Sequence, residues 1–139
     1  VYGIENKKER IAYITDKFRL DGVLKQKAKT LSGGWQRKLS IAISLINSPK
    51  ILFLDEPTLG LDVISRRELW QIIEELKKDI TVILTTHYME EAEALSDRVG
   101  IMANGRLTCV GTVDELKRKA GTDNFEEAFI KLATGGGVQ

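Results

Sequence analysis

The sequence predicts an α/β fold with a mainly parallel sheet, and two apolar segments carry this prediction. Residues 51–55, ILFLD, and residues 81–86, TVILTT, are short apolar or β-branched runs, typical of strands buried on both faces of a parallel sheet. The segment between them has helical periodicity, and the order strand, helix, strand favours parallel neighbours. The chain of 139 residues, 42% of them hydrophobic, is long enough to form one domain with a core.

Two helices are expected before the first strand. Residues 5–19 carry apolar side chains on one helical face, namely Ile11, Ile14 and Phe18. A second helix is expected to begin after the Ser-Gly-Gly of residues 32–34. It should end before Pro49, because the residue before a proline avoids helical geometry. Its expected apolar stripe consists of Leu39, Ala42, Ile43 and Ile46.

The elements after the first strand are a helix, the second strand, a short helix, a hairpin and two further helices. Residues 64–78 have helical periodicity with one apolar face, made of Leu69, Ile72, Ile73 and Leu76. Residues 90–97 predict a short helix, and residues 98–111 predict a hairpin that turns at Asn104-Gly105.

Two capping signals predict the helices that close the chain. Thr112 and Glu115 have the spacing of a capping box, for a helix that runs to about residue 119. Asp123 and Glu126 have the same spacing and are expected to open a last helix. Its apolar face consists of Phe125, Phe129 and Leu132. The final GGGVQ is expected to fray.

Composition argues against several classes of protein. The net charge is +1, so the chain lacks the basic excess of a nucleic-acid-binding protein and no nucleic-acid partner is expected. A local excess of basic residues over residues 1–30 is interpreted as a solvated helical face. The single Cys109 excludes an internal disulfide and fits a reducing compartment. No apolar run approaches the roughly 18 residues that a membrane span needs.

Reactive residues follow both predicted strands. Asp55 and Glu56 end the first strand, and His87 follows the second. Ligands of open parallel sheets bind beyond the carboxyl ends of the strands. Asp55 could hold Mg²⁺, largely through water, and Glu56 could polarise a water for attack on a phosphate. The alternative interpretations are a strand that ends in solvated acids and a structural, hydrogen-bonding histidine.

Residues 31–36, LSGGWQ, form a candidate phosphate contact without a phosphate-binding loop. Ser32 suits a helix N-cap, and two glycines leave the N–H groups of the helix start open to an anion. The same geometry can cap the helix when empty and bind phosphate when occupied. A Walker A loop would need Gly-Lys followed by Ser or Thr, and this tripeptide does not occur in the sequence.

Four segments in this order resemble the ATP-binding domain of ABC transporters. Residues 31–34, LSGG, match the family signature, and residues 51–58, ILFLDEPT, match Walker B with its following glutamate. Residues 59–62, LGLD, look like the D-loop, and residues 85–87, TTH, look like the switch-histidine segment. The resemblance covers nearly the whole chain. It is strongest to the exporter branch, which includes bacterial drug-export ATPases and the lipid-exporting A subfamily.

The resemblance implies a partial P-loop NTPase core with a mainly parallel sheet, a helical subdomain and a C-terminal hairpin with helices. Residues 1–48 would be the helical subdomain, which ends in the signature helix. Residues 49–111 would be the carboxyl-terminal half of the ATPase core, and residues 112–139 the C-terminal helices and frayed tail.

The resemblance also implies ATP and Mg²⁺ as cofactors, sandwiched between two domains that pair head to tail. Asp55 would help to hold Mg²⁺, Glu56 would act as general base, and His87 would contact the γ-phosphate. Asp62 would connect the two sites across the dimer. The signature contacts to the partner's nucleotide would come from Leu31, Ser32, Gly33, Gly34, Trp35 and Gln36.

The implied partners are transmembrane permease subunits, which contact the helical subdomain near residues 1–30. Closure of the dimer on ATP and its opening after hydrolysis would drive export. The domain would then lie peripherally on the cytoplasmic face of the cell membrane.

The sequence departs from the family pattern in two places. Trp35 stands where the signature usually has Gln, with Gln36 displaced by one position, so altered sugar or phosphate contacts are expected. The base-stacking aromatic residue, Walker A and the Q-loop glutamine of the family all precede the region matched here. We therefore expect the chain to be the carboxyl-terminal part of such a domain and to be inactive alone.

Three other classes stay open on the sequence. The chain could come from a soluble ABC-type ATPase of DNA repair or chromosome maintenance, or from a translation-linked ABC protein. It could also be a non-catalytic interaction module that kept the signature and lost nucleotide binding.

Overall fold

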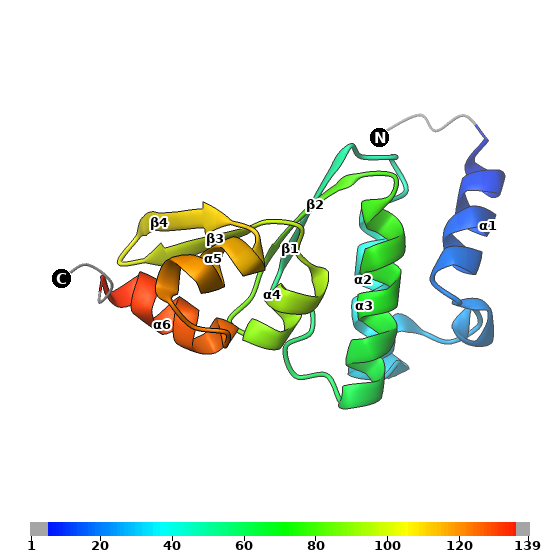
Figure 1. Cartoon of the computed structure of the whole chain (residues 1–139). Coiled ribbons are helices and arrows are strands. Elements are labelled where there is room, and N and C mark those ends of the chain that lie inside the picture. The colour runs from blue at the N-terminus through cyan, green and yellow to red at the C-terminus, as the bar shows by residue number, and fades with distance from the viewer. Residues whose placement is uncertain (1–5, 136–139) are drawn as a thin grey trace. The chain divides into compact units, whose positions relative to one another are not determined.

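The computed structural model describes residues 6–135, which form two compact units (Figure 1). The first unit ends at Thr85 and the second begins at Thr86. The start of the helix expected from residue 5 and the last four residues of the expected frayed tail lie outside the described residues.

The first unit contains the parallel sheet that the sequence predicts. In chain order its elements are α1 (Lys7–Lys17), the short 3-10 helices η1 (Asp21–Val23) and η2 (Ala28–Thr30), α2 (Gly33–Ser44), β1 (Ile51–Asp55), α3 (Val63–Lys77) and β2 (Thr81–Thr85). Strands β1 and β2 pair in parallel, from Ile51 opposite Thr81 to Asp55 opposite Thr85. The predicted strand–helix–strand order is therefore confirmed.

Helix α3 forms as predicted, because its apolar residues recur on one face. All four predicted residues of that face are buried, namely Leu69, Ile72, Ile73 and Leu76. The helix packs against β2 and against α2, which lies beside it (Figure 1). Asp62 caps its first turn, as described below.

The prediction that both strands are buried on both faces is wrong for this chain. Leu52 and Leu54 of β1 are buried, but Phe53 is 72% exposed. Its register partner Ile83 is 44% exposed on the same face of the sheet. Within residues 6–85 the helices cover only the opposite face, so side chains that alternate along each strand have different environments.

The predicted apolar stripe of α2 is also wrong in part. Ile43 is 57% exposed, and the buried positions of the helix are Gly34, Lys38, Ile41 and Ala42. The helix turns this face toward α3, where the absence of a Gly34 side chain allows close approach. A buried lysine on this face could not be expected from an apolar pattern.

The second unit is a hairpin packed on helices. Its elements are α4 (Met89–Leu95), β3 (Val99–Ala103), β4 (Arg106–Gly111), α5 (Val113–Ala120) and α6 (Phe125–Thr134). The hairpin turns at Asn104 and Gly105, both at positive φ, as a two-residue type I′ turn requires. One cluster forms the core of this unit: Ala92, Ile101, Cys109, Leu116, Phe125 and Ala128.

The last two helices of the second unit, α5 and α6, begin with side-chain caps, and the cap of α6 is shifted from its predicted position. Thr112 and Glu115 form the predicted capping box of α5. Helix α6 starts one residue later than predicted. Its N-cap is Asn124, whose side chain accepts a hydrogen bond from the Glu127 amide at 3.0 Å. Thr122 reinforces this arrangement, because its hydroxyl donates to the Glu127 carboxylate at 2.8 Å.

Among residues 6–135, no helix has the length and apolar character needed to cross a membrane.

Candidate functional site

Asp55 lies at the carboxyl end of β1, where its carboxylate is tied to the neighbouring strand. The Thr85 hydroxyl donates a hydrogen bond to Asp55 Oδ1, and the two residues are opposite each other in the ladder. The Asp55 carboxylate stays exposed. This geometry leaves a fixed carboxylate with lone pairs directed to solvent at the ligand-binding edge of the sheet.

Glu56 adopts an unusual backbone conformation directly after the strand. Its φ is 44°, in the left-handed region that residues other than glycine rarely occupy. Its amide donates to the Thr85 carbonyl at 3.0 Å, and its carbonyl accepts from the Leu59 amide at 3.2 Å. Backbone strain of this kind concentrates at functional sites. The turn holds the partly buried Glu56 one residue beyond Asp55.

The signature segment, residues 31–36, comprises the turn before α2 and the first residues of this helix. Ser32 occupies the predicted N-cap position, but its side chain makes no capping hydrogen bond to the helix. Ser32 and Gly33 are exposed, whereas Leu31 is buried. The Gln36 amide side chain folds back and donates to the Leu31 carbonyl at 2.9 Å, which fixes the turn before the helix.

Trp35 packs within the chain. Lys38 Nζ lies 4.5 Å from the centroid of the Trp35 ring, a cation–π distance. The same ammonium pairs with Glu68 of α3 at 2.5 Å. Lys38 is buried, so Trp35 and Glu68 together supply the favourable contacts that a buried charge needs.

Asp62 holds the first turn of α3. Its Oδ1 accepts hydrogen bonds from the amides of Ile64 and Ser65, each at 3.0 Å, and its Oδ2 accepts from the Ser65 hydroxyl at 2.7 Å. These hydrogen bonds lower the pKa of the exposed Asp62 carboxyl. The bond from the Ser65 amide has the largest effect on the pKa, and the bond from the Ser65 hydroxyl has the next largest. Asp62 is therefore ionised and oriented at neutral pH.

The signature segment and the residues around Asp62 pack directly on each other. A Cβ built on Gly34 would lie 2.8 Å from Ser65 Oγ, and one built on Gly33 would lie 4.0 Å from Leu61 Cδ2. The structure thus brings together residues 33–34 and residues 61–65. The sequence analysis assigned both segments to the site without predicting this contact.

His87 belongs to the second unit and precedes α4. It is exposed, and its ring lies 4.2 Å from the Tyr88 ring, centroid to centroid. The Tyr88 amide donates to Thr86 Oγ1 at 3.0 Å, which shapes the turn that carries the histidine.

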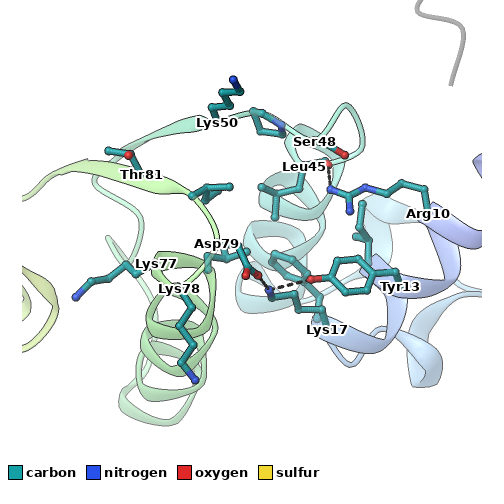
Figure 2. Close-up of a pocket in the computed structure, with 15 residues that line it drawn as sticks. Arg10, Tyr13, Lys17, Leu45, Ser48, Lys50, Lys77, Lys78, Asp79 and Thr81 are labelled. Atoms are coloured by element: carbon teal, nitrogen blue, oxygen red, sulfur yellow. Dashed lines mark hydrogen bonds and ion pairs between the residues drawn. The ribbon is translucent and has the colours of Figure 1, made fainter. Parts of the chain in front are cut away.

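A cavity of about 820 Å³ in the first unit contains none of the predicted site residues. It lies between α1 and the amino ends of β1 and β2, the opposite end of the sheet from Asp55 (Figure 2). Lys17 crosses it and donates to the Tyr13 hydroxyl at 3.1 Å and to Asp79 at 3.0 Å (Figure 2). Its position argues against a nucleotide site, since such ligands bind at carboxyl ends.

Some of the residues described above have the chemistry needed to bind Mg²⁺ and the phosphates of ATP, the two ligands that the resemblance implies. An exposed, hydrogen-bonded carboxylate such as Asp55 suits Mg²⁺, which takes one or two protein carboxylates and completes its shell with water and phosphate oxygens. Among residues 6–135, no group of three or more His, Cys, Asp or Glu side chains is arranged to hold a metal ion. The helix start after Ser32, free of a side-chain cap, suits a phosphate.

The sequence analysis missed the supporting contacts that three residues make in this region, namely Lys38, Ser65 and Thr85. Thr85 could have been found from strand register, since the last residues of two adjacent parallel strands lie opposite each other. No sequence signal pointed to Ser65 or Lys38, because their roles depend on how α2 packs against α3.

Comparisons with known proteins agree on one family. A family model described as ABC transporter matches residues 4–59. Three members of the ABC transporter A family from Arabidopsis thaliana are similar to the chain. Member 11 is 57% identical over 104 residues, member 9 is 58% identical over 104 residues, and member 2 is 59% identical over 98 residues. These matches cover 75%, 75% and 70% of the chain.

The chain spans only 11%, 11% and 10% of the length of these relatives, about a tenth in each case.

Solved structures show the same fold. An ATP-binding subunit of an ABC transporter matches 94% of the chain and 57% of its own length, with a TM-score of 0.78 and 29% identity. An ATP-binding cassette of an ABC transporter in its ADP conformation matches 94% of the chain and 52% of its own length, with a TM-score of 0.76 and 26% identity. The chain belongs to the ATP-binding domain family of ABC transporters.

Proposed function

We propose that this chain supplies the signature segment and the hydrolytic residues of an ATP-driven transporter of the A-family type. The observation that carries the proposal is the edge of the sheet at Asp55. There a carboxylate suited to Mg²⁺ is fixed by Thr85, and Glu56 follows it in a strained turn. The similarity to A-family members supports the same assignment.

In this proposal each residue acts on a different part of the reaction. Asp55 would hold Mg²⁺, which would supply positive charge to stabilise the phosphates of the nucleotide. Glu56 accepts a proton from the attacking water, and His87 donates a hydrogen bond to a γ-phosphate oxygen. The residues of the signature segment, with Asp62, serve the nucleotide held by a second domain. They are Leu31, Ser32, Gly33, Gly34, Trp35 and Gln36.

The proposed setting is a head-to-tail pair of ATP-binding domains on the cytoplasmic face of a membrane. Closure on ATP and opening after hydrolysis would move the transmembrane subunits and drive export. The chain contains no Gly-Lys-Ser/Thr, so the phosphate-binding loop must come from another segment. By itself the chain is expected not to hydrolyse ATP.

Calorimetric titration of the chain with Mg-ATP tests this division of roles. We expect no detectable binding, and clear binding would contradict the assignment of the phosphate loop to another segment.

The signature role is tested in a transporter that carries this chain. Ser32→Arg should abolish ATP hydrolysis, whereas Ser40→Arg, at an exposed position of the same helix, should not. Full hydrolysis by Ser32→Arg would refute the signature role.

A further inference from the structure

Gly34 and Ser65 approach so closely that no side chain fits between them. A Cβ at Gly34 would lie 2.8 Å from Ser65 Oγ and 3.0 Å from Ser65 Cβ. Cβ atoms in proteins essentially never show contacts below 3.0 Å, so either the Ser65 side chain or one of the two helices would have to shift. Gly34 is buried in this contact, whereas Gly33 beside it is exposed. The two glycines of the signature segment therefore have different structural requirements.

Ser65 is held on its other side by Asp62. Its hydroxyl donates to Asp62 Oδ2 at 2.7 Å, and its amide donates to Asp62 Oδ1 at 3.0 Å. One serine side chain thus faces the glycine of the signature helix and fixes the orientation of the Asp62 carboxylate. A displacement of α2 toward α3 would press on this hydroxyl and disturb its hydrogen bond.

We propose that Ser65 is a positioning residue that couples the signature segment at Gly34 to the Asp62 carboxylate. The inference rests on the proposed function, in which both segments face the nucleotide interface. A change in the position of the signature helix is transmitted to Asp62 through the Ser65 hydroxyl. The signature segment and Asp62, which both contact the second domain in the proposed function, therefore change position together.

A simple capping role for Ser65 leads to a different expectation. A serine in the first turn of a helix often supports the N-cap residue through its own hydrogen bonds. Such support would be independent of the residue at position 34. The proposal instead requires that a change at Gly34 alters the Asp62 carboxylate, and that a smaller residue at position 65 recovers part of the stability lost by the change at Gly34.

A double-mutant cycle on this chain distinguishes the coupling role of Ser65 from a simple capping role. The variants are Gly34→Ala, Ser65→Gly and the combination, and the readouts are the NMR titration of the Asp62 carboxyl and the thermal midpoint. We expect Gly34→Ala to lower the midpoint and to shift the Asp62 pKa upward, toward its ordinary value. Ser65→Gly in the Gly34→Ala background should recover part of the lost midpoint, because it removes both atoms that clash.

Gly33→Ala is the matched control, since a Cβ there meets only Leu61 Cδ2 at 4.0 Å. It should leave the Asp62 titration unchanged and keep or raise the midpoint. Equal effects of the two glycine variants would overturn the proposal, as would an additive cycle.

A second arm covers the case in which Gly34→Ala does not fold. In the parent chain the Gly34 amide shift should follow the titration of Asp62, and Ser65→Ala should remove this response while Ser65→Thr retains it. A Gly34 shift that responds equally in Ser65→Ala would overturn the coupling. All these measurements are made without nucleotide, so their failure is distinct from a failure of the proposed ATPase role.

Discussion

The Thr85 hydroxyl donates a hydrogen bond to the Asp55 carboxylate, and the two residues form the last pair of the parallel ladder between β1 and β2. This bond links the candidate Mg²⁺ ligand to the neighbouring strand. It also positions the strand end from which Glu56 and the turn after it begin. The pairing accounts for how an exposed carboxylate keeps one orientation at the edge of a two-stranded sheet.

Thr85→Val should lower the free energy of unfolding of the chain by about 0.5–1.5 kcal/mol, because one net hydrogen bond is lost. The change keeps the shape and β-propensity of the side chain. Thr81→Val, at the exposed first position of the same strand, is the control and should change stability by less. Urea unfolding of both variants measures the difference. Equal losses would mean that the Thr85 hydroxyl does not support Asp55.

Glu56→Gln should reduce ATP turnover by about 10²–10⁴-fold in a transporter that carries this chain, since the general base is lost. ATP binding should persist, and the closed dimer should accumulate. Turnover assays with size-exclusion chromatography in Mg-ATP measure both effects. Glu75→Gln, at an exposed position of α3, should turn over normally. Normal turnover by Glu56→Gln would refute the general-base assignment.

Glu68→Gln should destabilise the chain more than Lys38→Met does. The first change leaves a buried ammonium without its carboxylate, at a cost of about 1–3 kcal/mol, reduced because Glu68 is half-exposed. The second replaces the buried charge by an apolar side chain of similar length and should cost less than about 1.5 kcal/mol. Chemical unfolding ranks the two variants, and the reverse order would contradict this account of the pair.

The isolated chain should self-associate through the uncovered face of its sheet. Phe53 and Ile83 lie on that face, 72% and 44% exposed, and β2 has no second strand partner within residues 6–85. Size-exclusion chromatography with light scattering at rising concentration should show dimers or larger species. Phe53→Lys should reduce association, whereas Ile130→Lys, at an exposed position of α6, should not. A monomer at high concentration would refute the prediction.

Asp62 should make the stability of the chain fall in acid. Its pKa is lowered in the folded state by hydrogen bonds from Ser65 and Ile64. The stabilisation is therefore present above the ordinary pKa of 3.8 and is lost as the pH falls through the lower, folded value. The difference in stability between the parent chain and Asp62→Asn should shrink toward zero as the pH falls below 3.8 and through the lower, folded pKa. A constant difference over this range would show that the charge of Asp62 is not involved.

Much of the local structure followed from the sequence because it depends on neighbours along the chain. The hairpin at Asn104-Gly105 and the capping box at Thr112 were predicted correctly, since both are set by residues within a few positions. The buried face of α3 was predicted for the same reason, because four large apolar residues recur on it. The start of α6 was missed by one residue, where Asn124 competed with Asp123 for the same capping role.

The sequence by itself determined the α/β class, the parallel order of the strands and the segments that carry the reactive residues. Motif identity and spacing are properties of the chain, so they can be read from it. Tertiary structure alone decided which face of α2 is buried, which face of the sheet is left uncovered, and that Gly34 meets Ser65. Each of these depends on contacts between residues far apart in sequence. Lys38 is buried because Trp35 and Glu68 contact its ammonium group. Gly34 is required because the Ser65 side chain of another helix leaves no space for a Cβ atom.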